Sequence, residues 1–578
     1  MRGRRAARLT AALATGACAL ALSGTAAAVD PPSIVVTDGV TQPVFSYASA
    51  IRERVWIPVP GVDQNSDGVT DRVAVDIIRP QETNAGLKVP AIIDTSPYYT
   101  SVGRGNETEY LHSSSATQAD KFPLYYDNYF VPRGYAFIAA QAVGTAWSTG
   151  CPLHGGPGDV AGFKAVIDWL RGRVPGYNSR TASDTPVLAD WDNGKNAMFG
   201  KSYDGTFANG VASTGVEGLT TIVPISGISA WYDYSRSNGI RQNTGTHYPA
   251  SLSSTITANT NATNLGVVPP SNNASCAASR SAMSLIDGDA DGNINTFWDD
   301  RDYNKNVGNV HAAVFASHGL NDDNVKPDHF SKWWAGLLAN NVPHKVWLTQ
   351  TGHVDPFDYR RAAWVSTIHR WYDYWLQGVP NGIMDEPKAM IETAPNVFED
   401  HADWPLPGTK PINVFLRGGA TTAVAGNLGV SSGGPLATRL LADSPGQSEN
   451  TMISNPTGSQ TNRLVFLSQP LAAPLRLSGT PIVDTFASFN KTSANVGTLI
   501  VDYNATAFPK IARNGEGITT TSTSTCWGEA FGIDDACYFE VNKPSTNVTS
   551  WRVSKGVLDA QNRLSYFTDT PLTVGANT

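Results

Sequence analysis

Short apolar segments alternate with helical patterns between about residues 72 and 341 of this chain. The apolar segments have the length and character of strands that are buried on both faces. They lie at residues 73–78, 89–93, 135–140, 197–199, 221–225, 312–316 and 346–348. Between two of them, Val160, Phe163, Ile167 and Leu170 recur at helical spacing. This alternation predicts a mostly parallel sheet that is covered by helices on both faces.

The composition indicates a folded protein of several units. The chain has 578 residues, and because a typical domain has about 100–200 residues, we expect two or three units. Hydrophobic residues make up 41% and charged residues 16%, which excludes a disordered chain. The net charge is −8 and no long Lys/Arg run occurs, so the basic surface that nucleic acids require is missing from the sequence. We expect no nucleic-acid partner.

The first 28 residues have the layout of a secretory signal peptide. Four arginines within the first eight residues precede an apolar stretch at 9–22, and the small residues Ala26, Ala27 and Ala28 follow. We therefore expect cleavage near Ala28 and a secreted protein. No later stretch reaches the roughly 18 apolar residues that a spanning helix needs, so no membrane partner is expected.

Four cysteines remain after this segment: Cys151, Cys276, Cys526 and Cys537. An even number in an exported protein permits disulfides, and four cysteines allow three pairings. Pairing Cys526 with Cys537 would close a short loop, which leaves Cys151 for Cys276. Free buried thiols are the alternative, because a large domain does not need such cross-links. No Cys/His spacing indicates zinc, and no cofactor is expected.

Two changes in sequence texture divide the chain. Residues 231–303 are rich in Asn, Thr, Ser and Gly, which predicts an insertion over the sheet. A last helix is expected over 361–376, and beyond it the alternating patterns are typical of an antiparallel sandwich. The expected organisation is a signal peptide (1–28), an α/β domain (29–230 and 304–386), a cap insertion (231–303) and a C-terminal β-sandwich (387–578).

One serine stands in a glycine-rich turn, Gly200-Lys201-Ser202-Tyr203-Asp204-Gly205, after the apolar segment 197–199. A nucleophilic serine on a strand-to-helix turn needs small neighbours, because its backbone is strained and its hydroxyl must stand clear of the sheet. The backbone N–H of Tyr203 can then face an oxyanion. The usual pattern is Gly-x-Ser-x-Gly, and Asp204 replaces the second glycine. On this motif alone, a non-catalytic glycine turn is an equal alternative.

A serine nucleophile requires a base and an acid that orients the base. In α/β-hydrolases these follow in the order Ser, acid, His, each at the C-terminal end of a strand. Asp322 follows the apolar segment 312–316 and His353 follows 346–348, so both fit the order and the placement. Asp323 is the alternative acid, and Asp322 is preferred because it lies nearer the strand end.

A series of longer motifs surrounds these residues. They are Gly200-Lys201-Ser202-Tyr203-x-Gly205, Thr214-Gly215-Val216-Glu217-Gly218-Leu219, Ile228-Ser229-x-Trp231-Tyr232-x-Tyr234, Asn295-x-Phe297-Trp298-x-Asp300-Arg301-x-Tyr303 and His318-Gly319-Leu320-Asn321-Asp322-x-Asn324-Val325. Together they resemble the secreted and cytosolic Xaa-Pro dipeptidyl-peptidases, a serine peptidase family that also includes cocaine-esterase-like and amino-acid-ester hydrolases. The resemblance extends from about Val55 to the C-terminus.

The resemblance implies an α/β-hydrolase core with an inserted helical cap and a C-terminal jelly roll. It also implies Ser202 as nucleophile, Asp322 as acid and His353 as base. The Tyr98 hydroxyl, in the matching Ser-Pro-Tyr segment, would join the Tyr203 N–H as oxyanion donor. An aromatic ring packed at a strand end is the alternative role for Tyr98.

Proline-containing peptides are the substrates that the resemblance implies, and Trp231 and Tyr234 would line the pocket for the proline ring. Some family members bind the substrate amine through a Glu that follows the stretch corresponding to Asn238-Gly239. Residues 241–249 of this chain contain no acid. Glu217 is a candidate to serve instead, with a structural role as the alternative.

Two Asp-rich segments resemble the start of a calcium loop: Asp63, Asn65 and Asp67, and Asp287, Asp289 and Asp291. Their twelfth positions are Ala74 and Trp298, where a calcium loop has Glu. The favoured interpretation is therefore an Asp-rich turn in both places, with calcium as the alternative.

The sequence thus predicts a secreted serine peptidase that releases Xaa-Pro dipeptides through an acyl-enzyme. A second hypothesis keeps the same Ser-Asp-His residues but assigns them to esters or amides of small acyl groups. A third is a non-catalytic binding protein, and the complete order of Ser202, Asp322 and His353 argues against it. The sequence makes no prediction about oligomeric state.

Overall fold

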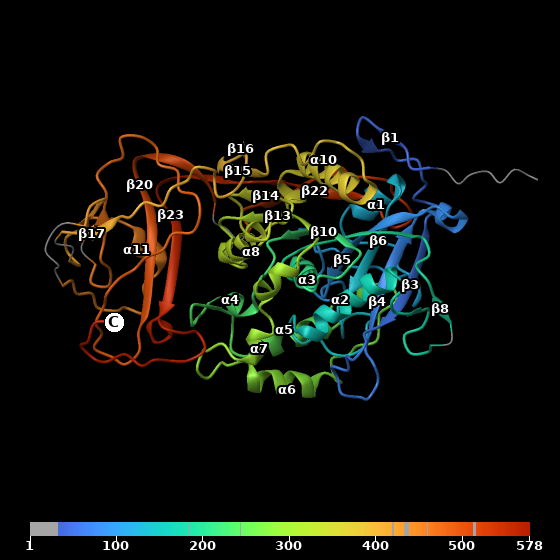
Figure 1. Ribbon diagram of the computed structural model, residues 1–578, viewed down its shortest axis with the longest axis horizontal. Coiled ribbons are helices and arrows are strands. Elements are labelled where there is room, and N and C mark those ends of the chain that lie inside the picture. The colour runs from blue at the N-terminus through green and yellow to red at the C-terminus, as the bar shows by residue number, and fades with distance from the viewer. Residues whose placement is uncertain are drawn as a thin grey trace, which may run out of the picture.

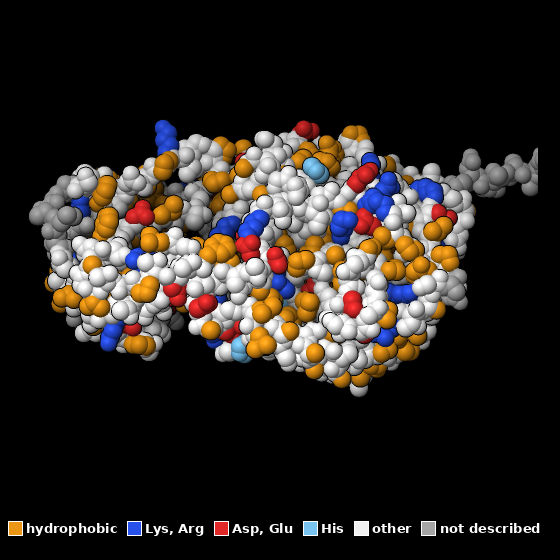
Figure 2. Space-filling model, turned by 60° about the horizontal axis from the view of Figure 1, so that its bottom comes forward, with side chains coloured by type: hydrophobic (Ala, Val, Ile, Leu, Met, Phe, Trp, Pro, Cys, Tyr) orange, Lys and Arg blue, Asp and Glu red, His pale blue; other side chains and the backbone are white. Residues whose placement is uncertain are grey.

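The computed structural model describes residues 33–183, 185–242, 244–418, 421–432, 438–458, 460–512 and 516–578. The predicted signal peptide, residues 1–28, lies outside the described residues. Among the helices of the described part, none combines the length and apolar character that a membrane crossing requires. The molecule is elongated, with an α/β unit at one end and most of a β-rich C-terminal unit at the other (Figure 1). Basic and acidic side chains are interspersed on the face in Figure 2.

A sheet of twelve strands forms the centre of the α/β unit. In spatial order its strands are β16 (Val397–His401), β15 (Ala389–Ala394), β14 (His344–Thr349), β13 (Ala313–Gly319), β10 (Leu219–Ile225), β9 (Asp192–Lys201), β5 (Val89–Ser96), β6 (Ala136–Gln141), β4 (Arg72–Arg79), β3 (Ile51–Pro58), β7 (Gly176–Tyr177) and β8 (Pro186–Val187). The strands from β15 to β6 run parallel, and antiparallel strands extend both edges. The predicted strand segments all lie within this sheet, so the α/β class is confirmed.

Helices cover both faces of the sheet because successive residues of a strand point to opposite sides. On β5, Ala91 and Ile93 enter one core and Ile92 enters the other. The first core is completed by α2 (Pro157–Leu170), α3 (Tyr203–Ala212) and α8 (Pro327–Ala339). The second is completed by α1 (Tyr126–Phe130), α9 (Pro356–Tyr359) and α10 (Arg361–Tyr372). Two buried faces explain why the sequence shows continuous apolar runs instead of alternation.

The insertion between β10 and β13 is helical, as the family resemblance implied. It contains α4 (Trp231–Ser235), the hairpin β11 (Arg236–Ser237) and β12 (Ile240–Arg241), α5 (Tyr248–Thr257), α6 (Ala277–Ile286) and α7 (Thr296–Asp299). We call residues 231–303 the cap. Short 3₁₀ helices lie at η1 (Gln81–Ala85), η2 (Val131–Arg133), η3 (Ala262–Asn264), η4 (Tyr303–Asn309) and η6 (Ala560–Asn562), and a π-helix lies at η5 (Asp373–Gln377).

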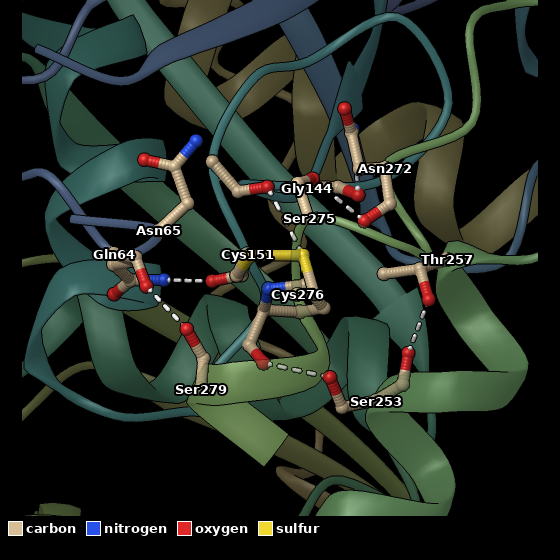
Figure 3. Close-up of a disulfide and its surroundings, with 12 residues drawn as sticks. Gln64, Asn65, Gly144, Cys151, Ser253, Thr257, Asn272, Ser275, Cys276 and Ser279 are labelled. Atoms are coloured by element: carbon tan, nitrogen blue, oxygen red, sulfur yellow. Dashed lines mark hydrogen bonds between the residues drawn. A yellow bond between two sulfur atoms is a disulfide. The ribbon is translucent and has the colours of Figure 1, made fainter. Parts of the chain in front are cut away.

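A disulfide between Cys151 and Cys276 joins the loop before α2 to the start of α6 (Figure 3). Polar bonds flank it: the Ser253 hydroxyl donates to the Pro152 carbonyl at 3.1 Å, and the Ser279 hydroxyl donates to the Gln64 carbonyl at 2.8 Å. Cys526 and Cys537 form the second disulfide, across the pair of β21 and β22. Both predicted pairings are present, and the first one fastens the cap to the α/β unit.

The C-terminal unit is built from β-strands, as predicted. Its elements are β17 (Phe415–Arg417), β18 (Gly426–Gly429), α11 (Glu449–Ile453), β19 (Phe466–Leu467), β20 (Asn495–Ile511), β21 (Thr519–Cys526), β22 (Cys537–Asn542) and β23 (Ser545–Asp559). Long antiparallel pairing joins β20 to β23. β15 and β16 lie beyond the boundary expected at residue 386, yet they belong to the central sheet. A short hairpin of β1 (Val36–Thr37) and β2 (Val40–Thr41) stands at the other end.

We expect the Cys151–Cys276 disulfide to contribute more stability than the Cys526–Cys537 disulfide. The two pairs are 125 and 11 residues apart, and closing the longer loop removes more entropy from the unfolded chain. The loop-entropy relation gives about 5 kcal/mol for the first bond and about 3 kcal/mol for the second. Thermal unfolding of the Cys151→Ala/Cys276→Ala and Cys526→Ala/Cys537→Ala variants measures both. Equal losses in the two variants would contradict the expectation.

Candidate active site

Ser202 lies on a sharp turn between β9 and α3. Its φ of +66° and ψ of −126° are unfavourable for a residue with a side chain, as at the strained serine turns of hydrolases. A Cβ at Gly205 would lie 2.5 Å from the Gly200 carbonyl oxygen, and a Cβ at Gly200 would collide with the Cβ of Asp204. Gly200 is therefore the residue that makes room for Asp204 where the usual pattern has glycine.

Asp204 is part of a buried ion-pair network beneath this turn. The Arg104 guanidinium lies 2.5 Å from the Asp204 carboxylate and 3.1 Å from that of Asp94 at the end of β5. The Tyr99 hydroxyl donates to Asp94 at 2.8 Å. Burial raises the pKa of Asp204 well above its usual value, and the attraction of Arg104 does not fully offset this. The network ties α3 to the segment after β5, which carries Tyr98.

Asp322 and His353 form a hydrogen-bonded pair. The Asp322 carboxylate lies 2.7 Å from Nδ1 of His353, and its other oxygen accepts the N–H groups of Asn324 and Val325, each at 2.9 Å. Burial raises the pKa of Asp322, but the interaction with His353 outweighs it, so the pKa lies below its usual value. An ionised Asp322 fixes the proton on Nδ1 and leaves Nε2 as the acceptor.

Asp323, the alternative acid, points elsewhere. Its side chain is exposed and lies 2.9 Å from Arg552 and 3.9 Å from Lys555, both on β23 of the C-terminal unit. Asp322, in contrast, is fully buried against His353. The geometry therefore favours Asp322 over Asp323 as the partner of the histidine.

The strand order brings these loops to one edge of the sheet. β14, β13, β10, β9 and β5 are neighbours, so their C-terminal ends stand together and carry His353, Asp322, Ser202 and Tyr98. The amide N–H of Ser202 donates to the Ile225 carbonyl at 2.9 Å. The ammonium of Lys201 lies 3.4 Å from the carbonyl oxygen of His353, so the serine turn and the histidine loop are in contact.

Tyr98 follows β5 beside the serine turn. Its ring meets the Tyr203 ring edge-on, with centroids 6.1 Å apart. Burial raises the pKa of the Tyr98 hydroxyl well above its usual value, and the nearby Tyr248 and Asp204 raise it further. The phenol therefore remains protonated, which is the form that donates a hydrogen bond to an oxyanion.

Aromatic rings from the cap gather against Tyr203. The Trp231 ring lies with its centroid 4.5 Å from that of Tyr203 and 5.6 Å from that of Tyr234, and Tyr234 lies 5.7 Å from Tyr248. His154, which is buried, packs 4.1 Å from Trp231. Sequence reasoning identified Trp231 and Tyr234 but missed Tyr248, His154 and the Arg104 network. The only sequence signal for His154 is the Gly155-Gly156 pair that follows it, since glycines permit close backbone approach.

The predicted role of Glu217 in binding the substrate amine is wrong. Glu217 is exposed and precedes β10, so it lies at the amino-terminal edge of the parallel sheet. Its carbonyl accepts a hydrogen bond from Arg173 at 2.7 Å. The catalytic candidates stand at the carboxyl-terminal edge, and a strand's length separates them from Glu217.

The two Asp-rich segments bond to themselves. Asp63 accepts the Gly68 N–H at 2.9 Å and Asp67 accepts the Val69 N–H at 2.8 Å, as in an Asp-rich turn.

In the second segment, Asp287 and Asp289 lie close to His247, but Asp291 turns to the Asn293 N–H. The Arg236 guanidinium lies 2.9 Å from the Asp289 carboxylate and that of Arg241 lies 3.4 Å from it, so two arginines already neutralise the charge of Asp289. Both observations favour the turn interpretation over calcium.

Comparisons with known proteins agree with this geometry. The family described as X-Pro dipeptidyl-peptidase (S15 family) matches residues 67–355, and the X-Pro dipeptidyl-peptidase C-terminal non-catalytic domain matches residues 381–577. A putative Xaa-Pro dipeptidyl-peptidase of Streptomyces avermitilis is 42% identical over 535 residues, which cover 92% of this chain and 76% of the relative. The chain belongs to the S15 family of X-Pro dipeptidyl-peptidases. The family assignment and the serine hydrolase class predicted from the sequence are confirmed.

Further relatives of this S15 family member support the same family and the same fold. A putative Xaa-Pro dipeptidyl-peptidase of Bacillus anthracis is 36% identical over 488 residues, covering 83% of this chain and 78% of the relative. Among solved structures, an aminopeptidase from a marine sediment Thaumarchaeota archaeon superimposes with a TM-score of 0.58 at 16% identity, over 95% of this chain and 87% of the other. An α-amino acid ester hydrolase superimposes with a TM-score of 0.55 at 16% identity, over 96% of this chain and 88% of the other. These superpositions show that the fold is shared.

We expect Asp358→Asn to make the protein less sensitive to alkaline pH. Asp358 follows the histidine loop, and burial together with Asp355 raises its pKa to about 7. A carboxyl whose folded pKa exceeds its unfolded value of about 4 loses stability as pH rises from about 4 to about 7. Asparagine removes that loss and keeps the acceptor for the Asn106 amide.

The expected result is a gain in free energy of unfolding that grows by about 2–3 kcal/mol between pH 5 and pH 8. Denaturant titrations of both proteins at the two pH values measure it. A difference between variant and parent that stays constant over this range would show that Asp358 does not titrate there.

Proposed function

We propose that this protein is an exported serine peptidase that releases Xaa-Pro dipeptides from free peptide N-termini. The observation that supports this most directly is the placement of Ser202 on a strained turn at the same edge of the sheet as the hydrogen-bonded pair of Asp322 and His353. The relatives described as Xaa-Pro dipeptidyl-peptidases supply the substrate class.

Acyl transfer through this site proceeds in two halves. Nε2 of His353 accepts the proton of the Ser202 hydroxyl as its oxygen attacks the carbonyl carbon of the substrate proline. The carbonyl oxygen becomes an oxyanion that accepts hydrogen bonds from the Tyr203 N–H and the Tyr98 hydroxyl. His353 then gives the proton to the leaving amine. Water, deprotonated by the same nitrogen, attacks the acyl-enzyme and releases the dipeptide.

The aromatic cluster accounts for the preference for proline. A pyrrolidine ring is compact, apolar and carries no N–H when its nitrogen is acylated, so aromatic walls solvate it without an unsatisfied donor. Tyr234, which is half-buried, would provide such a wall next to the serine turn, and the buried rings of Trp231 and Tyr203 pack together beside it. The Tyr234 hydroxyl already donates to the Asn324 amide oxygen at 2.9 Å, which holds its ring beside the acid loop.

Hydrolysis of small esters or amides is the second candidate. Glu217 lies at the wrong edge of the sheet, so the carboxylate expected to bind a free substrate amine is not supplied by that residue. A site that lacks such a group would favour uncharged acyl groups. The solved α-amino acid ester hydrolase shares the fold and keeps this candidate open to test.

Secretion is part of the proposal. It is supported by the basic and apolar pattern of residues 1–28 and by two disulfides of the kind that persist in oxidising compartments. N-terminal sequencing of the exported chain is the direct check, with Val29 as the expected first residue.

Ser202→Ala should lower kcat by about 10³-fold or more, because the nucleophile is removed while substrate binding remains. Gly-Pro and Ala-Pro anilides should be better substrates than their N-blocked forms and simple aryl esters. Ser213→Ala, at the other end of α3, is the matched control and should retain activity, since its hydroxyl donates to the Gly210 carbonyl within the same helix, away from the serine turn. A preference for blocked peptides or esters would replace the dipeptidyl function with the second candidate.

Tyr98→Phe should lower kcat by about 10²- to 10³-fold with a small change in KM. The hydroxyl stabilises charge that exists only in the transition state, so its loss should not weaken binding of the ground state. Steady-state kinetics on Ala-Pro anilide measures both constants. A variant with unchanged kcat would assign Tyr98 to packing alone.

A further inference from the structure

The C-terminal unit contacts the chain next to each member of the proposed triad. Among its many contacts with the rest of the chain, three fall on Lys201, Asp323 and Gly352, which are the sequence neighbours of Ser202, Asp322 and His353. The contacting residues, Glu516 and Arg552, lie in separate segments of the C-terminal unit.

On the acid side, β23 holds the loop that carries Asp322. Arg552, whose side chain is 9% exposed, binds both oxygens of Glu449 on α11 at 2.6 and 2.7 Å. Its other nitrogen lies 2.9 Å from the Asp323 carboxylate. Lys555 reaches the same two acids at 3.5 and 3.9 Å. Because Glu449 fixes the guanidinium, Arg552 presents a rigid anchor to Asp323, the residue after the acid.

On the base side, the segment before β21 holds the loop that carries His353. The Glu516 carbonyl accepts the Gly352 N–H at 3.0 Å, and its carboxylate lies 3.5 Å from the ammonium of Lys201. That ammonium also lies 3.4 Å from the His353 carbonyl oxygen. One lysine beside the nucleophile therefore connects the serine turn, the histidine loop and the C-terminal unit.

We propose that the C-terminal unit is a working part of the active site, in which Arg552 and Glu516 are positioning residues that align the loops of Asp322 and His353 with Ser202. The proposal rests on the triad of the proposed function. It gives a catalytic purpose to a unit whose family is described as non-catalytic. Arg552 contacts Asp323, and Glu516 contacts Gly352 and Lys201, so both would act through the neighbours of the triad residues.

The physical reason is the sensitivity of proton transfer to geometry. Acyl transfer requires the serine oxygen, the imidazole and the carboxylate to hold hydrogen-bond distances throughout the reaction. Asp322 and His353 both stand on loops beyond strand ends, and loops are held less precisely than strands. A displacement of about 1 Å is enough to slow such a reaction strongly. Contacts from the C-terminal unit to both loops reduce the range of positions that Asp322 and His353 can adopt.

The test compares Arg552→Met with Arg476→Met, a matched control. Arg476 also belongs to the C-terminal unit and forms an ion pair with the central sheet, 2.9 Å from Glu399 on β16, but no triad residue is adjacent. We expect Arg552→Met to lower kcat about fivefold with KM within twofold, and Arg476→Met to leave both within twofold. Arg552→Lys should recover part of the loss. Glu516→Gln should lower kcat about threefold.

A second readout separates this proposal from the substrate assignment. A small organophosphorus fluoride reacts with an activated serine without any peptide, so its rate reports the alignment of Ser202 and His353 directly. Arg552→Met should slow this reaction by the same factor as kcat. If the wild type reacts with the reagent but does not cleave Xaa-Pro anilides, the substrate class fails and the positioning role is still measured.

Thermal unfolding of each variant excludes a trivial loss of folded protein. The proposal predicts that the activity loss of Arg552→Met persists well below its unfolding midpoint. Equal effects of Arg552→Met and Arg476→Met, a change confined to KM, or a loss that follows the unfolded fraction would each overturn it. Since ion pairs carry the anchor, 1 M NaCl should slow the wild type more than Arg552→Met.

Discussion

The strained backbone at Ser202 is the constraint on which the site depends. A serine with positive φ at the end of a strand turns the chain straight into a helix, and this works only where the neighbouring residues leave space. Gly200 and Gly205 provide that space, and the Arg104 network pulls Asp204 into the protein interior. The strain is sustained by the surrounding sheet and helix, whose packing outweighs the local cost.

Strand polarity decides which polar residues can meet. In a parallel sheet every strand ends at the same edge, so residues that are 120 or 150 positions from the serine arrive beside it. The order Ser202, Asp322, His353 was accessible from sequence because each residue follows an apolar segment. The same rule, applied to Glu217, would have excluded it, since it precedes the predicted strand at 221–225. A carboxylate at the amino-terminal edge of the sheet cannot reach a substrate amine at the carboxyl-terminal edge.

Other features had no local signal in the sequence. Arg104 pairs with Asp94 and Asp204 only because a loop folds back over the strand ends, and spacing along the chain does not encode that contact. His154 lies against Trp231 because the Cys151–Cys276 bond holds its loop under the cap. The extension of the central sheet by β15 and β16 was hidden for a similar reason. A short strand has the same sequence pattern whether it extends a parallel sheet or belongs to a β-sandwich.

Three parts of the chain thus converge on one edge of one sheet, and each supplies what the others lack. The sheet places Ser202, Asp322 and His353 beyond strand ends at one edge, and Asp322 and His353 lie on loops there. The cap supplies aromatic walls that exclude water, which strengthens every electrostatic interaction of the site. Charged residues of the C-terminal unit bind the sequence neighbours of Ser202, Asp322 and His353. A restraint on a neighbouring residue limits the movement of the loop that carries each side chain.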